Sequence, residues 1–71
     1  MNINYDVETD ILTITLRKAT IQESDEVGRD VIADFAEDGT IVRFEILGAS
    51  HLVDDPRRVA LDITTPALAV R

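Results

Sequence analysis

The sequence predicts an α+β fold: a small antiparallel four-stranded sheet of two hairpins, with a short C-terminal helical element and room for an extra strand. Apolar and polar residues alternate with a period of two over four segments within residues 3–46, which is typical of half-buried strands. Asp38-Gly39 separates two of these segments, as a hairpin turn does. After residue 47 the alternation stops at Gly48-Ala49-Ser50, which indicates a break followed by a helix cap.

The first hairpin is predicted from the N-terminal residues. Ile3 and Tyr5 alternate with asparagines, and Leu12 and Ile14 alternate with threonines, around a polar connection at 7–10. Pairing the two segments around this connection places Tyr5 opposite Leu12 and Ile3 opposite Ile14. All four side chains then share one face, as a half-buried hairpin requires.

The second hairpin joins segments 31–35 and 41–46 through Asp38-Gly39. This dipeptide favours a two-residue type I′ turn, in which both central residues have positive φ. The predicted pairs are Val31 with Ile46, Ala33 with Phe44, Asp34 with Arg43, and Phe35 with Val42.

Asp34 and Arg43 decide this register. As a cross-strand pair they are opposite charges on the second face of the sheet, which is favourable. A three-residue loop ending in a bulge at Gly39 would instead place Asp34 on the face of Val42 and Phe44. We reject that loop because it buries a lone carboxylate.

The secondary structure of two segments is not decided by the pattern. Between the hairpins, Ala19, Ile21 and Glu23 extend a strand or add one, whereas Ser24-Asp25-Glu26 is typical of a turn or a helix start that ends at Gly28. Asp55-Pro56 is a helix-start signal, yet Val59, Leu61 and Ile63 alternate like a strand. For residues 59–64 we favour the strand over the helix, with Pro66 ending the element.

Charge and composition limit the partners and cofactors. Fourteen acidic residues against seven basic ones give a net charge of −7, which opposes direct binding to nucleic acid or to an anionic membrane. The chain has no cysteine and one histidine, so neither a disulfide framework nor a thiolate metal site is expected. We expect no cofactor, a cytoplasmic location, and a basic protein as the partner that this charge favours.

A homodimer is expected from the small size of the chain. Its 71 residues form a single domain (1–71), near the lower limit for an independent core. A sheet has two faces, and one or two helical turns cover only part of one of them. Ile11, Ile32 and Ile41 lie on the second face, where a second copy would bury them, unless the copies exchange the segment 59–64.

Three groups of residues are candidate chemical sites. Asp6, Glu8 and Asp10 have the alternating spacing of a calcium loop, but the glycine and the bidentate glutamate of that motif are missing, which favours a solvated acidic turn. Ser50 and His51 are adjacent, and adjacent side chains seldom face each other as a catalytic pair must. Ser50 is therefore expected to cap a helix, with His51 in solvent.

An acidic run, which comprises Glu23, Asp25, Glu26 and Asp30, is the third group. It is either a docking surface for a basic protein or a charged loop that protects a sheet edge from aggregation.

A string of spaced residues resembles a known family. It comprises Tyr5-Asp6, Asp10-x-Leu12-x-Ile14, Val27-Gly28, Val31-Ile32-x-Asp34-Phe35, Asp38-Gly39-x-Ile41-Val42-x-Phe44-Glu45-Ile46-Leu47 and Ala49-Ser50. The string is similar to the small prokaryotic family of domain of unknown function 2283, which covers about residues 3–50. The resemblance implies a compact antiparallel sheet with a helical element, and it implies no established activity and no catalytic residue. We therefore divide the domain into a family-like sheet core (1–50) and a C-terminal extension (51–71).

The function predicted from these observations is a small, acidic, non-enzymatic protein-interaction module that self-associates. An antitoxin-like role as the partner of a basic protein is implied only by the resemblance. The alternatives are a small enzyme or a metal- or ligand-binding domain that uses the acidic residues at Asp6–Asp10, and a dimer that binds DNA. For Asp34, Arg43, Asp38 and Gly39 the expected roles are structural: a charge pair and a turn.

Overall fold

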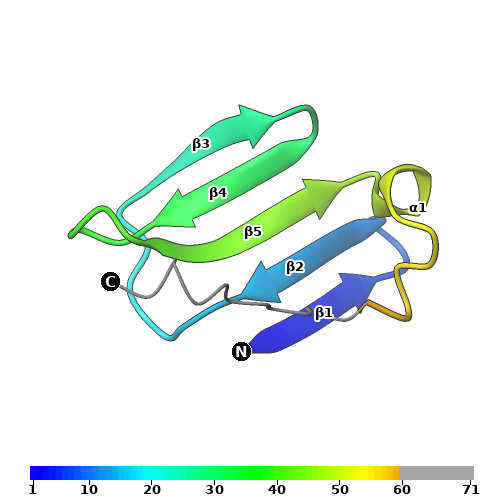
Figure 1. Cartoon of the computed structure of the whole chain (residues 1–71), viewed down its shortest axis with the longest axis horizontal. Helices are drawn as coiled ribbons and strands as arrows, with labels where there is room; N and C mark the ends of the chain where they lie inside the picture. Colours follow the sequence, from blue (N-terminus) through cyan, green and yellow to red (C-terminus); the bar gives the residue numbers. More distant parts are fainter. Residues whose placement is uncertain (60–71) are drawn as a thin grey trace, which may run out of the picture.

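The structure, a computed structural model that describes residues 1–59, is a single antiparallel sheet of five strands with one short helix (Figure 1). The strand order is β1-β2-β5-β4-β3. The elements are β1 (Asn2–Asp6), β2 (Ile11–Thr15), β3 (Glu23–Gly28), β4 (Val31–Phe35), β5 (Ile41–Leu47) and α1 (Ala49–Leu52). The mostly antiparallel sheet with a helical element is confirmed, whereas the predicted number of four strands is wrong.

The unpredicted strand is β3, where the sequence favours a turn or a helix start at Ser24-Asp25-Glu26. These residues form a strand because their backbone pairs with β4, Ser24 opposite Asp34 and Asp25 opposite Ala33. All six residues of β3 are exposed, so the strand has no apolar alternation that a pattern could reveal. A tight connection precedes β4, and Asp30 within it has a φ of 59°.

The pairing of β1 with β2 is as predicted, with Tyr5 opposite Leu12 and Ile3 opposite Ile14. Between β4 and β5, the predicted pairs of Val31 with Ile46, Ala33 with Phe44 and Asp34 with Arg43 also occur. Phe35, however, pairs with Ile41 instead of Val42.

The loop between β4 and β5 explains this difference. Gly39 N donates to Ala36 O at 2.9 Å and Ala36 N donates to Thr40 O at 2.9 Å, which closes a three-residue loop. Gly39 has a φ of 85°, whereas Asp38 keeps a negative φ, so the predicted type I′ turn is wrong. The loop is the three-residue alternative with glycine at the left-handed position.

A register shift between Asp34 and Phe35 reconciles this loop with the Asp34–Arg43 pair. Val42 is the additional residue on β5, and the shift places Ile41 directly across from Phe35, on the side of the apolar core. The expected position of Ile41 on the second face is therefore wrong. A three-residue loop was expected to place Asp34 on the face of Val42 and Phe44. It does not, because the register shift at Val42 returns Asp34 to the opposite face.

A substitution at Gly39 tests this loop. A Cβ at this position would meet no atom within 4 Å, so the cost of Gly39→Val comes from the backbone alone. We expect a loss of about 1–2 kcal/mol in the free energy of unfolding, measured by urea denaturation, because a β-branched residue is forced to positive φ. Gly39→Asn, which tolerates this φ, should lose much less, and equal losses for the two variants would contradict the assignment.

The apolar core lies between one face of the sheet and the segment that follows β5. It is formed by Leu12, Ile14 and Ala49, with Ile3, Tyr5, Phe44, Ile46, Val53 and Val59 packed against it. In Figure 1, α1 lies at the end of the sheet where β5 ends and β2 begins. Gly48 precedes α1 with a φ of 61°, and no side chain of residue 48 caps the helix. The predicted break at Gly48 is thus a left-handed residue that turns the chain onto the core.

The C-terminal predictions are tested only in part. Asp55 Oδ1 accepts a hydrogen bond from Arg57 N and Asp55 O accepts one from Arg58 N, both at 3.0 Å, so Asp55-Pro56 starts a turn. No helix follows this turn within the described residues. The strand or helix over 59–64 and its end at Pro66 fall on residues 60–71, outside the described part of the chain. No helix in residues 1–59 is long and apolar enough to cross a membrane.

Candidate functional site

Asp10 is the centre of the first polar network. Its carboxylate accepts hydrogen bonds from the Tyr5 hydroxyl at 2.6 Å, from Ser50 N at 3.0 Å and from Ser50 Oγ at 2.6 Å. Its backbone carbonyl accepts a further bond from Ala49 N at 3.0 Å. Asp10 has a φ of 57°, a left-handed conformation that aspartate tolerates better than most residues.

These bonds join the turn between β1 and β2 to the first turn of α1, 40 residues along the chain. The hydrogen bonds from Ser50 and then from Tyr5 lower the pKa of the Asp10 carboxyl, and the bond to Asp10 raises the pKa of Tyr5. Asp10 is therefore held as an anion that fastens α1 to the sheet.

This network tests the roles that the sequence predicts for Ser50 and His51. Ser50 lies within α1 and donates to Asp10, so the prediction that it caps the helix is wrong: Gly48 holds that position. Ser50 thus has a partner other than His51, which is exposed, as expected. The network was missed because its members lie on three separate elements. The signal was available in the family-like string, which includes Tyr5, Asp10 and Ser50.

Asp6 and Glu8 do not join Asp10 in a metal site. Asp6 Oδ1 accepts a bond from Glu8 N at 3.0 Å, which makes Asp6 a turn residue, and Glu8 is exposed. Among residues 1–59, no three His, Asp or Glu side chains gather where they could hold a metal ion. The geometry therefore gives no support to metal chemistry at Asp6–Asp10.

Asp34 is the centre of the second polar network, on the face opposite the core. Its side chain is only 1% exposed, and it accepts hydrogen bonds from Ser24 Oγ at 2.5 Å and from Arg43 Nε at 2.6 Å. The Arg43 guanidinium also lies 3.6 Å from the Glu45 carboxylate. The predicted Asp34–Arg43 pair is present, and Ser24 extends it to the edge strand β3.

Two carboxyl groups in this network titrate differently. Burial favours the neutral form of Asp34, but the hydrogen bonds that it accepts from Glu45, Ser24 and Arg43 outweigh burial and lower its pKa. The pKa of Glu45 is raised, first by its hydrogen bond to Asp34 and then by burial. Asp34 is consequently the anion that pairs with Arg43, and Glu45 is the group that prefers to keep its proton.

Glu45→Gln is expected to stabilise the folded chain at neutral pH. Because folding raises the Glu45 pKa above its ordinary value of 4.5, ionisation of Glu45 opposes folding as the pH increases. Glutamine keeps a donor toward Asp34 without the charge. The gain should be present in urea denaturation at about pH 7 and vanish at about pH 3, where Glu45 is protonated in both states. A gain at both pH values, or an equal gain from the exposed control Glu37→Gln, would contradict this assignment.

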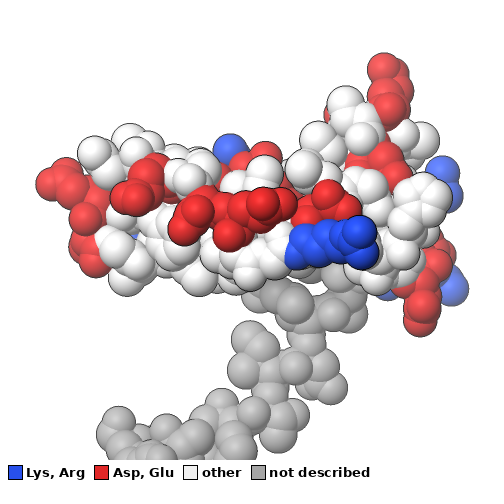
Figure 2. Space-filling view, turned by 90° about the horizontal axis from the view of Figure 1, so that it is seen from above, with Lys and Arg blue, Asp and Glu red and all other residues white. Residues whose placement is uncertain are grey.

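The third polar feature is the acidic edge, which we define as Glu23, Asp25 and Glu26 of β3. All three side chains are exposed. Figure 2, which views the molecule from the β3 side, shows acidic side chains gathered in a band along this side. Within residues 1–59, strand β3 pairs with β4 on one side only and is the last strand of the sheet. The structure thus combines a row of negative charge with an open strand edge, which fits both a docking surface and the protection of a sheet edge from aggregation.

Comparison with known proteins identifies the family. Neither the curated proteins nor the solved structures include a match to this chain. The model of a family described as "Protein of unknown function (DUF2283)" matches residues 2–50, which contain all five strands and the start of α1. The resemblance seen in the sequence is confirmed, and the chain belongs to the DUF2283 family.

Proposed function

We propose that this chain is a non-enzymatic protein-interaction module that binds a basic protein along the acidic edge of β3, as an antitoxin-like partner would, and that also self-associates. The observation that carries the proposal is β3 itself. It is an edge strand, all six of its residues are exposed, and three of them are acidic. An edge strand presents unpaired backbone donors and acceptors to which an extended segment of a partner can add as a further strand.

Charge selects the partner. Antiparallel pairing of β3 with β3 of a second copy would bring six carboxylates together, which is unfavourable. An extended segment with Lys or Arg at alternate positions would instead oppose Glu23 and Asp25, which share one face of the sheet. The net charge of −7 also accelerates encounter with a basic partner.

The experiment uses a peptide of alternating lysine and valine, with a peptide of alternating glutamate and valine as control. We expect the basic peptide to bind, and binding to protect the β3 amides from hydrogen exchange. Glu23→Gln/Asp25→Asn, which changes two exposed side chains on one face of β3, should weaken binding by about tenfold, since two exposed ion pairs contribute up to about 1 kcal/mol each. The matched control Glu8→Gln/Asp54→Asn removes the same charge from exposed positions elsewhere and should bind almost normally.

Two results would oppose this proposal. Equal weakening by the two double variants would mean that net charge alone attracts the peptide. Protection of β1 amides in place of β3 amides would mean that a different edge of the sheet is used.

Self-association is proposed through the second face of the sheet. Ile11, Ile32 and Leu47 are half-buried there, and no described helix or strand covers them. Asp34, Arg43 and Glu45 lie on the same face, but they form a compensated cluster in which the positive charge contacts both carboxyl groups. A second copy that covers Ile11, Ile32 and Leu47 would therefore meet a guanidinium that is already paired.

Light scattering coupled to gel filtration tests self-association. We expect a dimer at micromolar concentration, and Ile32→Lys should convert it to a monomer because the lysine would be buried in the interface. Val7→Lys, at an exposed turn position, is the matched control and should leave the dimer intact. A monomer for the unaltered chain would refute self-association without affecting the proposal for β3.

A further inference from the structure

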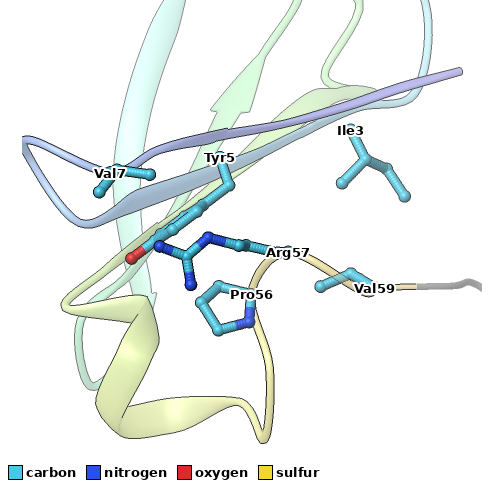
Figure 3. Close-up of a pocket in the computed structure, with 6 residues that line it drawn as sticks. All are labelled: Ile3, Tyr5, Val7, Pro56, Arg57 and Val59. Atoms are coloured by element: carbon cyan, nitrogen blue, oxygen red, sulfur yellow. The ribbon is translucent and has the colours of Figure 1, made fainter.

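A cavity lies between β1 and the segment that follows α1. Its volume is about 420 Å³. Figure 3 shows its lining residues, which are Ile3, Tyr5, Val7, Pro56, Arg57 and Val59. Five of the six present hydrocarbon or an aromatic ring, and one presents a guanidinium. Binding sites for small molecules share this composition: a mostly apolar lining with few polar groups that orient the ligand.

Arg57 is the charged group of this cavity. Its guanidinium lies beside the Tyr5 side chain in Figure 3, and its positive charge acts on the Tyr5 hydroxyl. Within residues 1–59, Arg57 has no carboxylate within ion-pair distance, and neither have Lys18, Arg29 and Arg58; among these four cations, Arg57 is the one that lines this cavity. The notable feature of Arg57 is therefore its position, because its guanidinium faces a mostly apolar cavity.

The Tyr5 hydroxyl, on which the Arg57 charge acts, is already engaged. The Tyr5 hydroxyl donates to Asp10, and Asp10 also accepts two bonds from Ser50. Asp10 therefore has hydrogen-bond partners in both Tyr5 and Ser50. The Arg57 guanidinium is the charged group in the cavity lining that a ligand could bind.

We propose that this cavity binds a small monocarboxylate with an aliphatic body. The planar guanidinium matches a carboxylate through two parallel hydrogen bonds, and the side chains of Ile3, Val7, Pro56 and Val59 match a hydrocarbon chain. A phosphate ester is disfavoured because one cation faces the cavity, whereas the protein as a whole repels a second negative charge. This site is separate from the acidic edge of β3, and it does not depend on the function proposed above.

Hexanoate is the probe, with 1-hexanol as a neutral probe of the same chain length. Tyr5 is the sole tyrosine and the chain has no tryptophan, so intrinsic fluorescence reports on the cavity directly. We expect hexanoate to change this fluorescence saturably and to shift the Arg57 Nε–H signal in NMR spectra. 1-Hexanol should bind at least about tenfold more weakly, because it lacks the charge that makes the hydrogen bonds strong.

Arg57→Gln and Arg58→Gln form a matched pair. Both remove one exposed positive charge from adjacent positions, but only Arg57 lines the cavity. We expect Arg57→Gln to lose at least about tenfold in hexanoate affinity, Arg58→Gln to bind normally, and Arg57→Lys to recover part of the affinity. The dispersion of the amide spectrum shows that each variant is folded.

Three outcomes would overturn this proposal: no saturable response to hexanoate, equal affinity for 1-hexanol, or equal loss in the two glutamine variants. The last of these would assign the effect to net charge.

Discussion

Asp34→Ala is expected to reduce the free energy of unfolding by about 2–3 kcal/mol and to release β3 from the sheet. The substitution removes the acceptor of two short hydrogen bonds, from Ser24 at 2.5 Å and from Arg43 at 2.6 Å. Arg43 is 38% exposed and can turn to water, so the cost lies at the low end of that for breaking a buried ion pair. Urea denaturation measures the loss, and hydrogen exchange at β3 amides measures the release.

Asp25→Ala is the matched control, since Asp25 lies on β3 next to Ser24 and is exposed. It should leave both stability and β3 exchange close to those of the unaltered chain. The double variant Asp34→Ala/Arg43→Ala should lose less stability than the two single losses added together, because the pair acts as a unit. Additive losses would mean that the ion pair contributes nothing beyond its separate side chains.

Leu12→Ala is expected to cost about 2–5 kcal/mol, the range for a leucine removed from a core. Leu12 is fully buried and packs with Ile14 and Ala49 at the centre of the apolar core. A core of this size supplies only about 3–5 kcal/mol in total, so the variant should be largely unfolded at room temperature. Circular dichroism during urea titration measures the change.

Leu16→Ala is the matched control for this variant. Leu16 follows β2 and is 39% exposed, so its truncation leaves no closed cavity and should cost much less. Equal losses at the two leucines would mean that the core is not centred on Leu12.

Binding of hexanoate should change the stability of the Leu12 variant. Hexanoate bound in the cavity beside Tyr5 would stabilise the folded state in proportion to its occupancy. Because Tyr5 also packs against the core, Leu12→Ala should recover part of its folded population when hexanoate is added. Leu12→Ala/Arg57→Gln should recover none, which separates specific binding from a general effect of the fatty acid.

The strands with apolar alternation were predictable from the sequence. Leu12 and Ile14 are buried at alternate positions of β2, and Ile3 and Tyr5 face them from β1. Such a pattern has one satisfactory register, because a slip by one residue would expose every apolar side chain. The Asp34–Arg43 pair followed from the same reasoning, although the loop type beside it did not.

The acidic edge could be predicted as a charged segment but not as a strand. Residues 23–28 have low intrinsic preference for a strand and no buried side chain, so β3 forms only through its pairing with β4 and the Ser24–Asp34 bond. The loop at Asp38-Gly39 was misassigned for a related reason. The three-residue loop is compatible with the Asp34–Arg43 pair only because a register shift at Val42, the second residue of β5, compensates for it.

The amino-acid sequence by itself determined the two apolar hairpins, the pairing of Asp34 with Arg43 and the negative charge of the surface. These follow from side-chain period and charge, which are local properties. Only the tertiary structure decided that Asp10 fastens α1, that β3 completes the sheet and that Arg57 faces a cavity beside Tyr5. Each of these depends on groups that chain folding brings together from distant positions, and a local pattern carries no information about such contacts.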